Sequence, residues 1–465
     1  MMALAVASVA LALFLICKMM YSSYCNPVSF YVIPWGLATL FAISGLYGIY
    51  VPADGTVALV VISMIAFALG CVFIHSVWQS RCRFGLARST PLGSRVSTSI
   101  HFDFTLTLCA RRLLYALGAL AIAYELYLAA RSIPLLLGGQ GLDYIKYQYS
   151  NVEGTTLFST RELLLFSWVS QPIIISIMMF FACELCSHRV NWAMFTFSIV
   201  GCALYITISG GRNLLFIFFC ILLVTLILSS QIGGVIRWLH SLPKAVKFLA
   251  IALIIAMVFI TEQRSLGHNA SVLENVFFYL FGGITYFDQM LANSSMFDLL
   301  NGNYLLGWST FGFIVNPILI VASVIFRFDY IGSDAILSDA ASIYLPFNDT
   351  LRGNGLCTCL YAFIRDFGLP GVFLGPFLFG LMTGIVWERT FRSAIPNFKW
   401  FPICIYFMYC VLFSTWRYLL VFPGTAAVFM VIIAVNIMNR RAAASDARRS
   451  EVTGSKRIVD DRRPV

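Results

Sequence analysis

Long runs of apolar residues follow one another along most of the chain, separated by shorter polar segments. About 20 residues of α-helix are needed to cross the hydrocarbon core of a bilayer, and eleven runs come near that length. They lie at 2–21, 30–50, 56–78, 113–130, 163–183, 192–208, 213–229, 248–261, 369–387, 400–416 and 420–437. The pattern therefore predicts an all-α, polytopic transmembrane bundle of about eleven spans.

The longest interval without a predicted span covers residues 262–368. Loops of this length are usually functional. This one contains two stretches rich in apolar and aromatic residues, 276–292 and 304–326. We expect both to form short helices at the membrane interface, with aromatic rings at the level of the headgroups. The alternative for the second stretch is a full span.

These patterns divide the chain into four parts. The predicted parts are an N-terminal transmembrane bundle (1–261, with loops 79–112 and 131–162), a large loop (262–368), C-terminal transmembrane helices (369–437) and a disordered basic tail (438–465).

Composition supports a membrane protein. Residues of the AVILMFWYC set make up 60% of the chain and charged residues only 11%, against about 45–50% and about 25% in soluble proteins. A water-soluble globule of this size cannot bury so much apolar surface. A soluble enzyme, a disordered protein and a disulfide-rich secreted domain are therefore excluded.

Basic residues give the orientation, because cytoplasmic loops are enriched in Lys and Arg. One set of alternate loops together with the tail holds 21 Lys and Arg in 100 residues, and the opposite set holds 8 in 148. The basic side is predicted to be cytoplasmic, which puts the loop 262–368 outside. The net charge of +10 is then explained by basic residues at the cytoplasmic face, which attract anionic lipids. It does not indicate nucleic-acid binding.

The few outer arginines are candidate ligands for an anion. Arg212 ends the turn Ser209-Gly210-Gly211-Arg212 between two predicted spans. Free N–H groups at the start of the next helix and a planar guanidinium would together suit phosphate. The alternative is a plain hairpin turn with a snorkelling arginine.

A second group follows the run 248–261. Glu262, Arg264 and His268 would place a carboxylate, a guanidinium and an imidazole at the mouth of the bundle. The alternatives are a boundary anchor for Arg264 and a solvated loop position for His268.

A third group ends the long loop. Asp349 and Arg352 lie in a turn-rich polar stretch, and Arg365 and Asp366 come directly before the span that starts at 369. The two arginines are candidate anion ligands. Asp366 can equally cap the following helix.

The other sizeable outer loop, 131–162, is rich in glycine and tyrosine and is bracketed by Arg131 and Arg161. Tyr147 and Arg161 are candidates for stacking on and hydrogen bonding to a sugar, although tyrosines here also fit an interfacial belt. The sequence contains no nucleotide-binding or metalloprotease motif.

Several short motifs resemble those of the Wzy-type O-antigen and oligosaccharide repeat-unit polymerases of bacterial envelopes. The motifs are Cys25-Asn26-Pro27 leading into Trp35, Phe67-Ala68-Leu69-Gly70, Ser209-Gly210-Gly211-Arg212, and Arg365-Asp366-Phe367-Gly368-Leu369-Pro370-Gly371 after the single large outer loop.

The resemblance implies a multi-pass enzyme of the bacterial inner membrane that joins undecaprenyl-pyrophosphate-linked oligosaccharide units on the periplasmic face. It also implies a flippase and a chain-length regulator as partners in the same pathway. Arginines would bind the pyrophosphate, and an acceptor would take the hydroxyl proton; the candidates are Glu262, His268, Asp288, Asp349 and Asp366.

The loop shows no acidic cluster with metal-ligand spacing, so the predicted transfer needs no metal or cofactor. Two other functions stay open: an O-antigen ligase or related lipid-linked-sugar transferase, and a flippase for the lipid-linked sugar.

Overall fold

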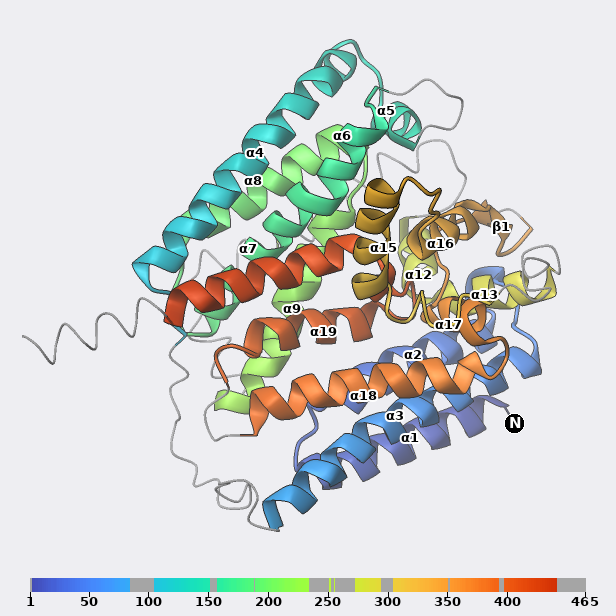
Figure 1. Ribbon diagram of the computed structural model, residues 1–465. Coiled ribbons are helices and arrows are strands. Elements are labelled where there is room, and N and C mark those ends of the chain that lie inside the picture. The colour runs from blue at the N-terminus through green and yellow to red at the C-terminus, as the bar shows by residue number, and fades with distance from the viewer. Residues whose placement is uncertain are drawn as a thin grey trace, which may run out of the picture. The chain divides into compact units, whose positions relative to one another are not determined.

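The computed structural model describes residues 2–83, 104–150, 157–187, 189–233, 251, 255, 272–293, 304–349, 352–392 and 397–440. Helices make up nearly all the regular structure of this part of the chain (Figure 1), and its strands are the two-residue pair β1 (Leu345–Pro346) and β2 (Arg352–Gly353). Eight of the described helices are long and apolar enough to cross a membrane. The predicted all-α class is confirmed, and the helices indicate a multi-pass membrane protein.

Eight predicted spans coincide with these helices. Their bounds are Met2–Tyr21, Pro27–Ser44, Asp54–Ser80, Leu108–Leu137, Thr160–Cys186, Trp192–Ser209, Gly371–Phe391 and Pro423–Arg440. The runs 213–229 and 400–416 form shorter apolar helices, Asn213–Leu228 and Phe401–Phe413. The run 248–261 lies outside the described residues except for 251 and 255, so the number of spans stays a prediction.

The chain folds into two compact units. The first unit comprises Met1–Phe102 and Arg212–Ala426, and the second comprises Asp103–Gly211 and Ala427–Val465. The helices of the first unit are α1 (Met2–Tyr21), α2 (Pro27–Ser44), α3 (Asp54–Arg83), α9 (Asn213–Gly233), α12 (Val272–Phe281), α13 (Gly283–Ala292), α15 (Gly312–Phe326), α16 (Ser333–Ser342), α17 (Cys359–Phe367), α18 (Gly371–Phe391) and α19 (Phe401–Phe413). Those of the second unit are α4 (Leu108–Leu137), α5 (Leu142–Ser150), α6 (Thr160–Leu165), the π-helical turn η3 (Phe166–Ser170), α7 (Gln171–Cys186) and α8 (Trp192–Ser209).

Helix α2 starts and stops at residues suited to those positions. The Asn26 side chain accepts a hydrogen bond from the Ser29 amide, and Pro27 occupies the first helical position, where its missing N–H costs nothing. Gly45 ends the helix with a left-handed φ of 59°, which glycine adopts without strain. The helix therefore stops six residues before the predicted end at residue 50.

Helices α3 and α18 lie side by side in the first unit (Figure 1) and approach closely through glycines. A Cβ atom added to Gly70 would lie 2.3 Å from the Phe377 carbonyl oxygen, and one added to Gly380 would lie 2.3 Å from that of Phe67. Small residues let the backbones of membrane helices make van der Waals contact, since the hydrophobic effect does not drive helices together in lipid.

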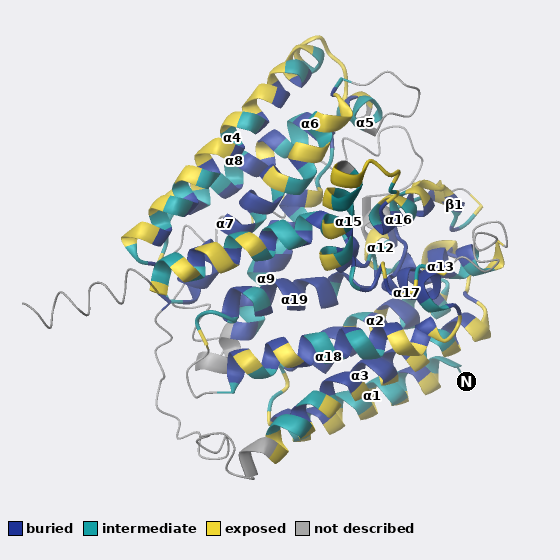
Figure 2. Cartoon of the chain, in the orientation of Figure 1, coloured by how far each residue is buried: buried dark blue, intermediate teal, exposed yellow. Residues whose placement is uncertain are grey.

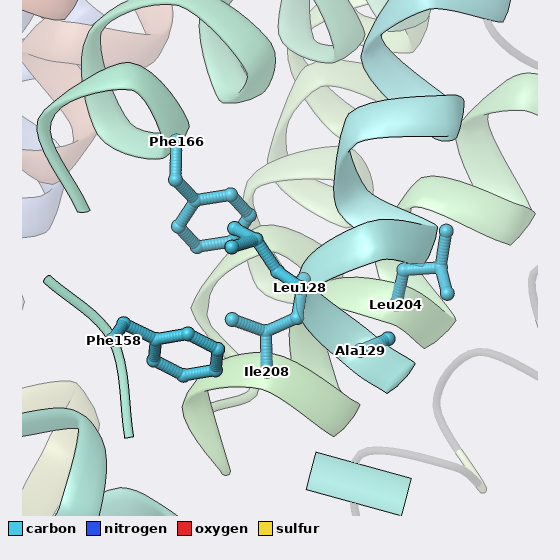
Figure 3. Close-up of a cluster of buried hydrophobic side chains, with 6 residues drawn as sticks. All are labelled: Leu128, Ala129, Phe158, Phe166, Leu204 and Ile208. Carbon is cyan, nitrogen blue, oxygen red and sulfur yellow. The ribbon is translucent and has the colours of Figure 1, made fainter. Parts of the chain in front are cut away.

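The second unit contains a buried cluster formed by several of its elements (Figure 3). The cluster joins α4, the segment before α6, the turn η3 and α8, and it consists of Leu128, Ala129, Phe158, Phe166, Leu204 and Ile208. Helix α7 is buried along most of its length, whereas α4 exposes one long stripe (Figure 2). A one-sided apolar stripe on α4 is what lipid contact requires of a peripheral span.

The described parts of segment 262–368 are largely helical, as predicted. Helices α12 and α13 cover most of the predicted stretch 276–292, and α15 occupies the second half of 304–326. With 15 residues, α15 is about 22 Å long, which is shorter than a hydrocarbon core of about 30 Å. Placement of these helices at the interface stays a prediction.

Candidate functional site

The candidate site is built around Arg365, near the end of α17. The side chain of Arg365 is only 3% exposed. Its Nε and Nη1 atoms are buried without a hydrogen-bond partner among the described residues, and no described carboxylate forms an ion pair with it. A buried, unpaired cation is costly, so the fold maintains a guanidinium with free donors at an energetic cost.

The loop after residue 304 holds the end of α17 in place. The Leu305 and Leu306 amides donate to the carbonyl oxygens of Arg365 (3.0 Å) and Asp366 (3.1 Å). The Asp366 carboxylate accepts from the Ser309 amide at 2.9 Å and from the Thr310 amide and hydroxyl, both at 2.6 Å. Burial raises the pKa of Asp366, and these hydrogen bonds oppose the rise.

The alternative that Asp366 caps the following helix is wrong. Pro370 stands at the N-cap of α18, and no side chain caps that helix. Asp366 instead fixes the turn at residues 309–310, which closes over the C-terminal end of α17. Its oxygens are occupied by backbone and hydroxyl donors, which gives it a structural role in positioning its neighbour Arg365.

Arg417 is the second cation of the site. It follows α19, and its Nη2 donates to the Ser338 hydroxyl of α16 at 3.1 Å. Burial raises the pKa of Cys357 to about 12, with Arg417 opposing the rise. Burial likewise raises the pKa of Tyr361 to about 12, and there the opposing cation is Arg365.

Arg365 therefore acts electrostatically on Tyr361, and Arg417 acts on Cys357. Cys357 also acts electrostatically on Tyr361, which links the two groups to each other. We call Arg365 and Arg417, with Ser338, Cys357 and Tyr361, the arginine cluster. All five residues belong to the first unit.

Arg212 lies at the start of α9, where its carbonyl oxygen accepts from the Phe216 amide at 3.1 Å. The guanidinium carbon lies 4.8 Å from the centre of the Tyr279 ring. Phe216 stacks on Trp416 at 4.6 Å, and the Trp416 indole N–H donates to the Leu280 carbonyl oxygen at 3.2 Å. The first turn of α9 and the end of α12 thus pack around the residue that precedes Arg417.

The glycine turn before Arg212 is confirmed. Gly210 caps α8 with a left-handed φ of 60°. A Cβ atom there would lie 2.3 Å from the Leu142 carbonyl oxygen of α5. Gly210 therefore permits a close approach between its own backbone and that of α5 within the second unit.

Arg352 and Asp349 occupy exposed positions of the hairpin formed by β1 and β2. The Tyr50 hydroxyl donates to the Asp349 carboxylate at 2.9 Å, and this hydrogen bond raises the pKa of Tyr50. Phe347 of the same hairpin stacks on Tyr286 at 5.9 Å between ring centres, and Arg417 opposes the burial-driven rise in the pKa of Tyr286. The hairpin therefore packs against Tyr286, whose phenol interacts electrostatically with Arg417.

Asp288 has a structural partner. Its carboxylate accepts from the Ala53 amide at 3.1 Å and the Thr56 hydroxyl at 2.5 Å, which satisfies donors at the N-terminus of α3.

Arg161 and Tyr147 belong to the second unit, on α6 and α5. Arg161 is exposed and Tyr147 is half-buried. The other arginine of this loop, Arg131, forms a two-point ion pair with Glu162 (2.8 and 2.9 Å). Glu162 also completes a capping box with Ser159, so Arg131 serves the local structure.

Three predicted residues, Glu262, Arg264 and His268, lie outside the described residues.

Sequence reasoning missed Arg417 as a site residue. Its position in Trp416-Arg417-Tyr418, a cation between two aromatic residues at a span end, was the available signal. Within the described ranges, no three His, Cys, Asp or Glu residues come close enough to hold a metal ion.

We compared the chain with family models, with curated proteins and with solved structures, and no family model, curated protein or solved structure matches it.

Proposed function

We propose that this protein is a membrane glycosyltransferase that joins lipid-linked oligosaccharide repeat units into a surface polysaccharide such as O-antigen. The single observation that carries the proposal is Arg365, a buried guanidinium with two nitrogen donors, Nε and Nη1, that no described residue satisfies. An anion with several acceptor oxygens would satisfy these donors, and the pyrophosphate of a polyprenyl-linked sugar has that chemistry.

In the proposed reaction, the growing chain is the donor and the next repeat unit is the acceptor. The bond between the anomeric carbon of the donor and the pyrophosphate oxygen breaks, and a bond to an acceptor hydroxyl oxygen forms. The hydroxyl proton leaves to a base, and undecaprenyl pyrophosphate is released. Negative charge grows on the departing oxygen, so Arg365 and Arg417 stabilise the transition state more than the ground state.

Three further arginines have a proposed role in binding around this centre. Arg212 lies near the residue preceding Arg417 through the packing of Tyr279 and Trp416, and Arg352 lies on the adjacent hairpin. Arg264 is proposed from the sequence. Glu262 and His268 are the proposed proton acceptors, because the described alternatives Asp288, Asp349 and Asp366 already accept structural hydrogen bonds.

The proposed setting is the periplasmic side of a bacterial inner membrane. The transfer is proposed to need no metal or cofactor. The pathway would supply the substrate through a flippase and set product length through a regulator.

The test compares Arg365→Met with the unchanged chain. Because replacing a buried unpaired cation by an apolar side chain of similar length removes an uncompensated charge, the variant should be at least as thermostable as the unchanged protein. It should nevertheless lose polymerisation by about 100-fold or more, the loss typical of removing one electrostatic catalyst. Purified protein in vesicles would be given undecaprenyl-pyrophosphate-linked repeat units from a strain lacking this gene.

Arg327→Gln is the matched control, since Arg327 is an exposed cation of the same outer segment. The control should form the same ladder of chains as the unchanged protein. Full ladders from Arg365→Met would refute the site. The unchanged protein would also be given a lipid core as acceptor. Transfer to that core with no chain growth would indicate a ligase, and movement of the lipid-linked sugar without new glycosidic bonds would indicate a flippase.

A further inference from the structure

Among the described residues of the second unit, two glutamates are buried, and their surroundings differ greatly. Glu184, near the end of α7, is 1% exposed. Its carboxylate accepts from Arg111 Nη2 at 2.8 Å and Nε at 3.2 Å, and from the Asn191 amide group at 2.9 Å. A buried carboxylate with a cation and a further donor is stable in its charged form.

Glu125, in α4, has no cationic partner among the described residues. Its side chain is fully buried, and only Oε1 has a partner, the Ser170 hydroxyl at 2.7 Å. Oε2 is buried, and no residue in the described part of the chain forms a hydrogen bond with it. Glu125 lies twelve residues before the end of α4 at Leu137, or about 18 Å along the helix, well inside a segment long enough to span the membrane.

The elements packed against α4 bring little charge to Glu125. Helix α8 contributes the thiol of Cys202, which interacts electrostatically with the glutamate. The turn η3 contributes the uncharged Ser170. Towards the C-terminal end of α4 lies the buried apolar cluster of Figure 3, which includes Leu128 and Phe166. Tyr149 of α5 and Tyr205 of α8 lie at the edge of that cluster and interact electrostatically with each other.

A charged carboxylate in these surroundings would carry the full cost of desolvation, which one serine hydroxyl cannot offset. A neutral carboxylic acid avoids that cost. We therefore propose that Glu125 is a proton-binding site within the second unit, occupied by a proton at neutral pH. This inference does not depend on the proposed transferase activity, because none of its residues belongs to the arginine cluster.

Ser170, the hydrogen-bond partner of Glu125, lies in an irregular turn. Ser170 ends the π-helical turn Phe166–Ser170, and its hydroxyl lies 3.3 Å from the Ala121 carbonyl oxygen as well as 2.7 Å from Glu125. π-Helical turns within α-helices are often found at functional sites. Loss of the proton would place a negative charge beside the apolar cluster, so we expect it to loosen the contact between α4 and η3.

Infrared difference spectra of the full-length protein in bilayers at neutral pH provide the first test. Subtracting the spectrum of Glu125→Gln from that of the unchanged protein should leave the carbonyl band of a protonated carboxylic acid. Glu184→Gln is the matched control, and its subtraction should leave only carboxylate bands. If the Glu125→Gln subtraction leaves carboxylate bands instead, the proposal is wrong.

A second measurement uses the unchanged protein and covers failure of a variant to fold. Dicyclohexylcarbodiimide reacts with protonated carboxyls in apolar surroundings, and peptide mapping would locate the adduct. Modification of Glu125 but not Glu184 is expected, falling about tenfold for each pH unit once Glu125 ionises. Equal modification of both, or modification of Glu184 alone, would overturn the proposal. If neither glutamate reacts, the infrared spectra decide, since they do not depend on access of the reagent. If Glu125→Gln does not fold, Glu125→Asp takes its place in the infrared measurement and should shift the band of the protonated acid.

Discussion

Replacing Asp366 by Asn tests whether the turn at residues 309–310 positions the arginine cluster. The aspartate accepts three hydrogen bonds from Ser309 and Thr310, of 2.6 to 2.9 Å. Asparagine keeps one carbonyl oxygen and turns an NH2 group towards the remaining donors. At least one buried donor then loses its acceptor.

The expected size of the effect follows from that loss. A buried donor left unsatisfied costs about 1–3 kcal/mol, and removing the buried charge of Asp366 recovers part of the cost. We expect the turn to lose about 2 kcal/mol of local stability, which corresponds to about a 30-fold increase in opening. Thr310→Val removes only the hydroxyl donor and should cost about 1 kcal/mol.

Hydrogen exchange of the Ser309 and Thr310 amides in the purified protein measures this opening directly. In Asp366→Asn, both amides should lose about 30-fold in protection, and polymerisation should fall because the end of α17 is no longer held. Asp339→Asn, an exposed position on α16, should leave the two amides unchanged. Unaltered protection in Asp366→Asn, or an equal loss in the control, would refute the reasoning.

Two further predictions concern helix packing and pH. Gly380→Ala would bring a Cβ atom to 2.3 Å from the Phe67 carbonyl oxygen, so we expect α3 and α18 to separate and the melting temperature to fall by several degrees. Gly55→Ala, whose added Cβ atom meets no atom within 4 Å, should leave the melting temperature unchanged. Equal melting temperatures of the two variants would contradict the packing argument. Tyr50 donates to Asp349, and this bond raises the pKa of the phenol, so the anchor holds below the ordinary tyrosine value of about 10 and is lost as pH rises through the higher folded value. In an ultraviolet titration, the tyrosinate absorbance of Tyr50 is the part that Tyr50→Phe removes, and it should appear at a higher pH than that of an ordinary tyrosine. Asp349→Asn should shift it to lower pH, and no shift would show that the hydrogen bond is absent in solution.

The sequence by itself determined the helical spans and many of their ends. A bilayer requires each spanning segment to satisfy its own backbone hydrogen bonds, so an apolar run of the right length already specifies a helix. The glycine turn at Gly210 also followed from the sequence, because glycine adopts without strain the left-handed conformation that ends a helix. The end of α2 was predicted six residues too late, because the apolar run continues past Gly45, whose left-handed conformation ends the helix.

Only the tertiary structure decided which polar side chains meet. Arg365 and Arg417 are 52 residues apart, and Glu125 and Ser170 are 45 apart, so no local pattern could pair them. The same holds for Asp366, for which the sequence left open a proton acceptor or a cap on the following helix. In the fold, it accepts hydrogen bonds from a turn that includes Thr310, 56 residues before it. The physical reason is that a charged group in an apolar interior is controlled by whatever partners the packing brings to it. The sequence names those groups, and the fold determines which of them remain without a partner.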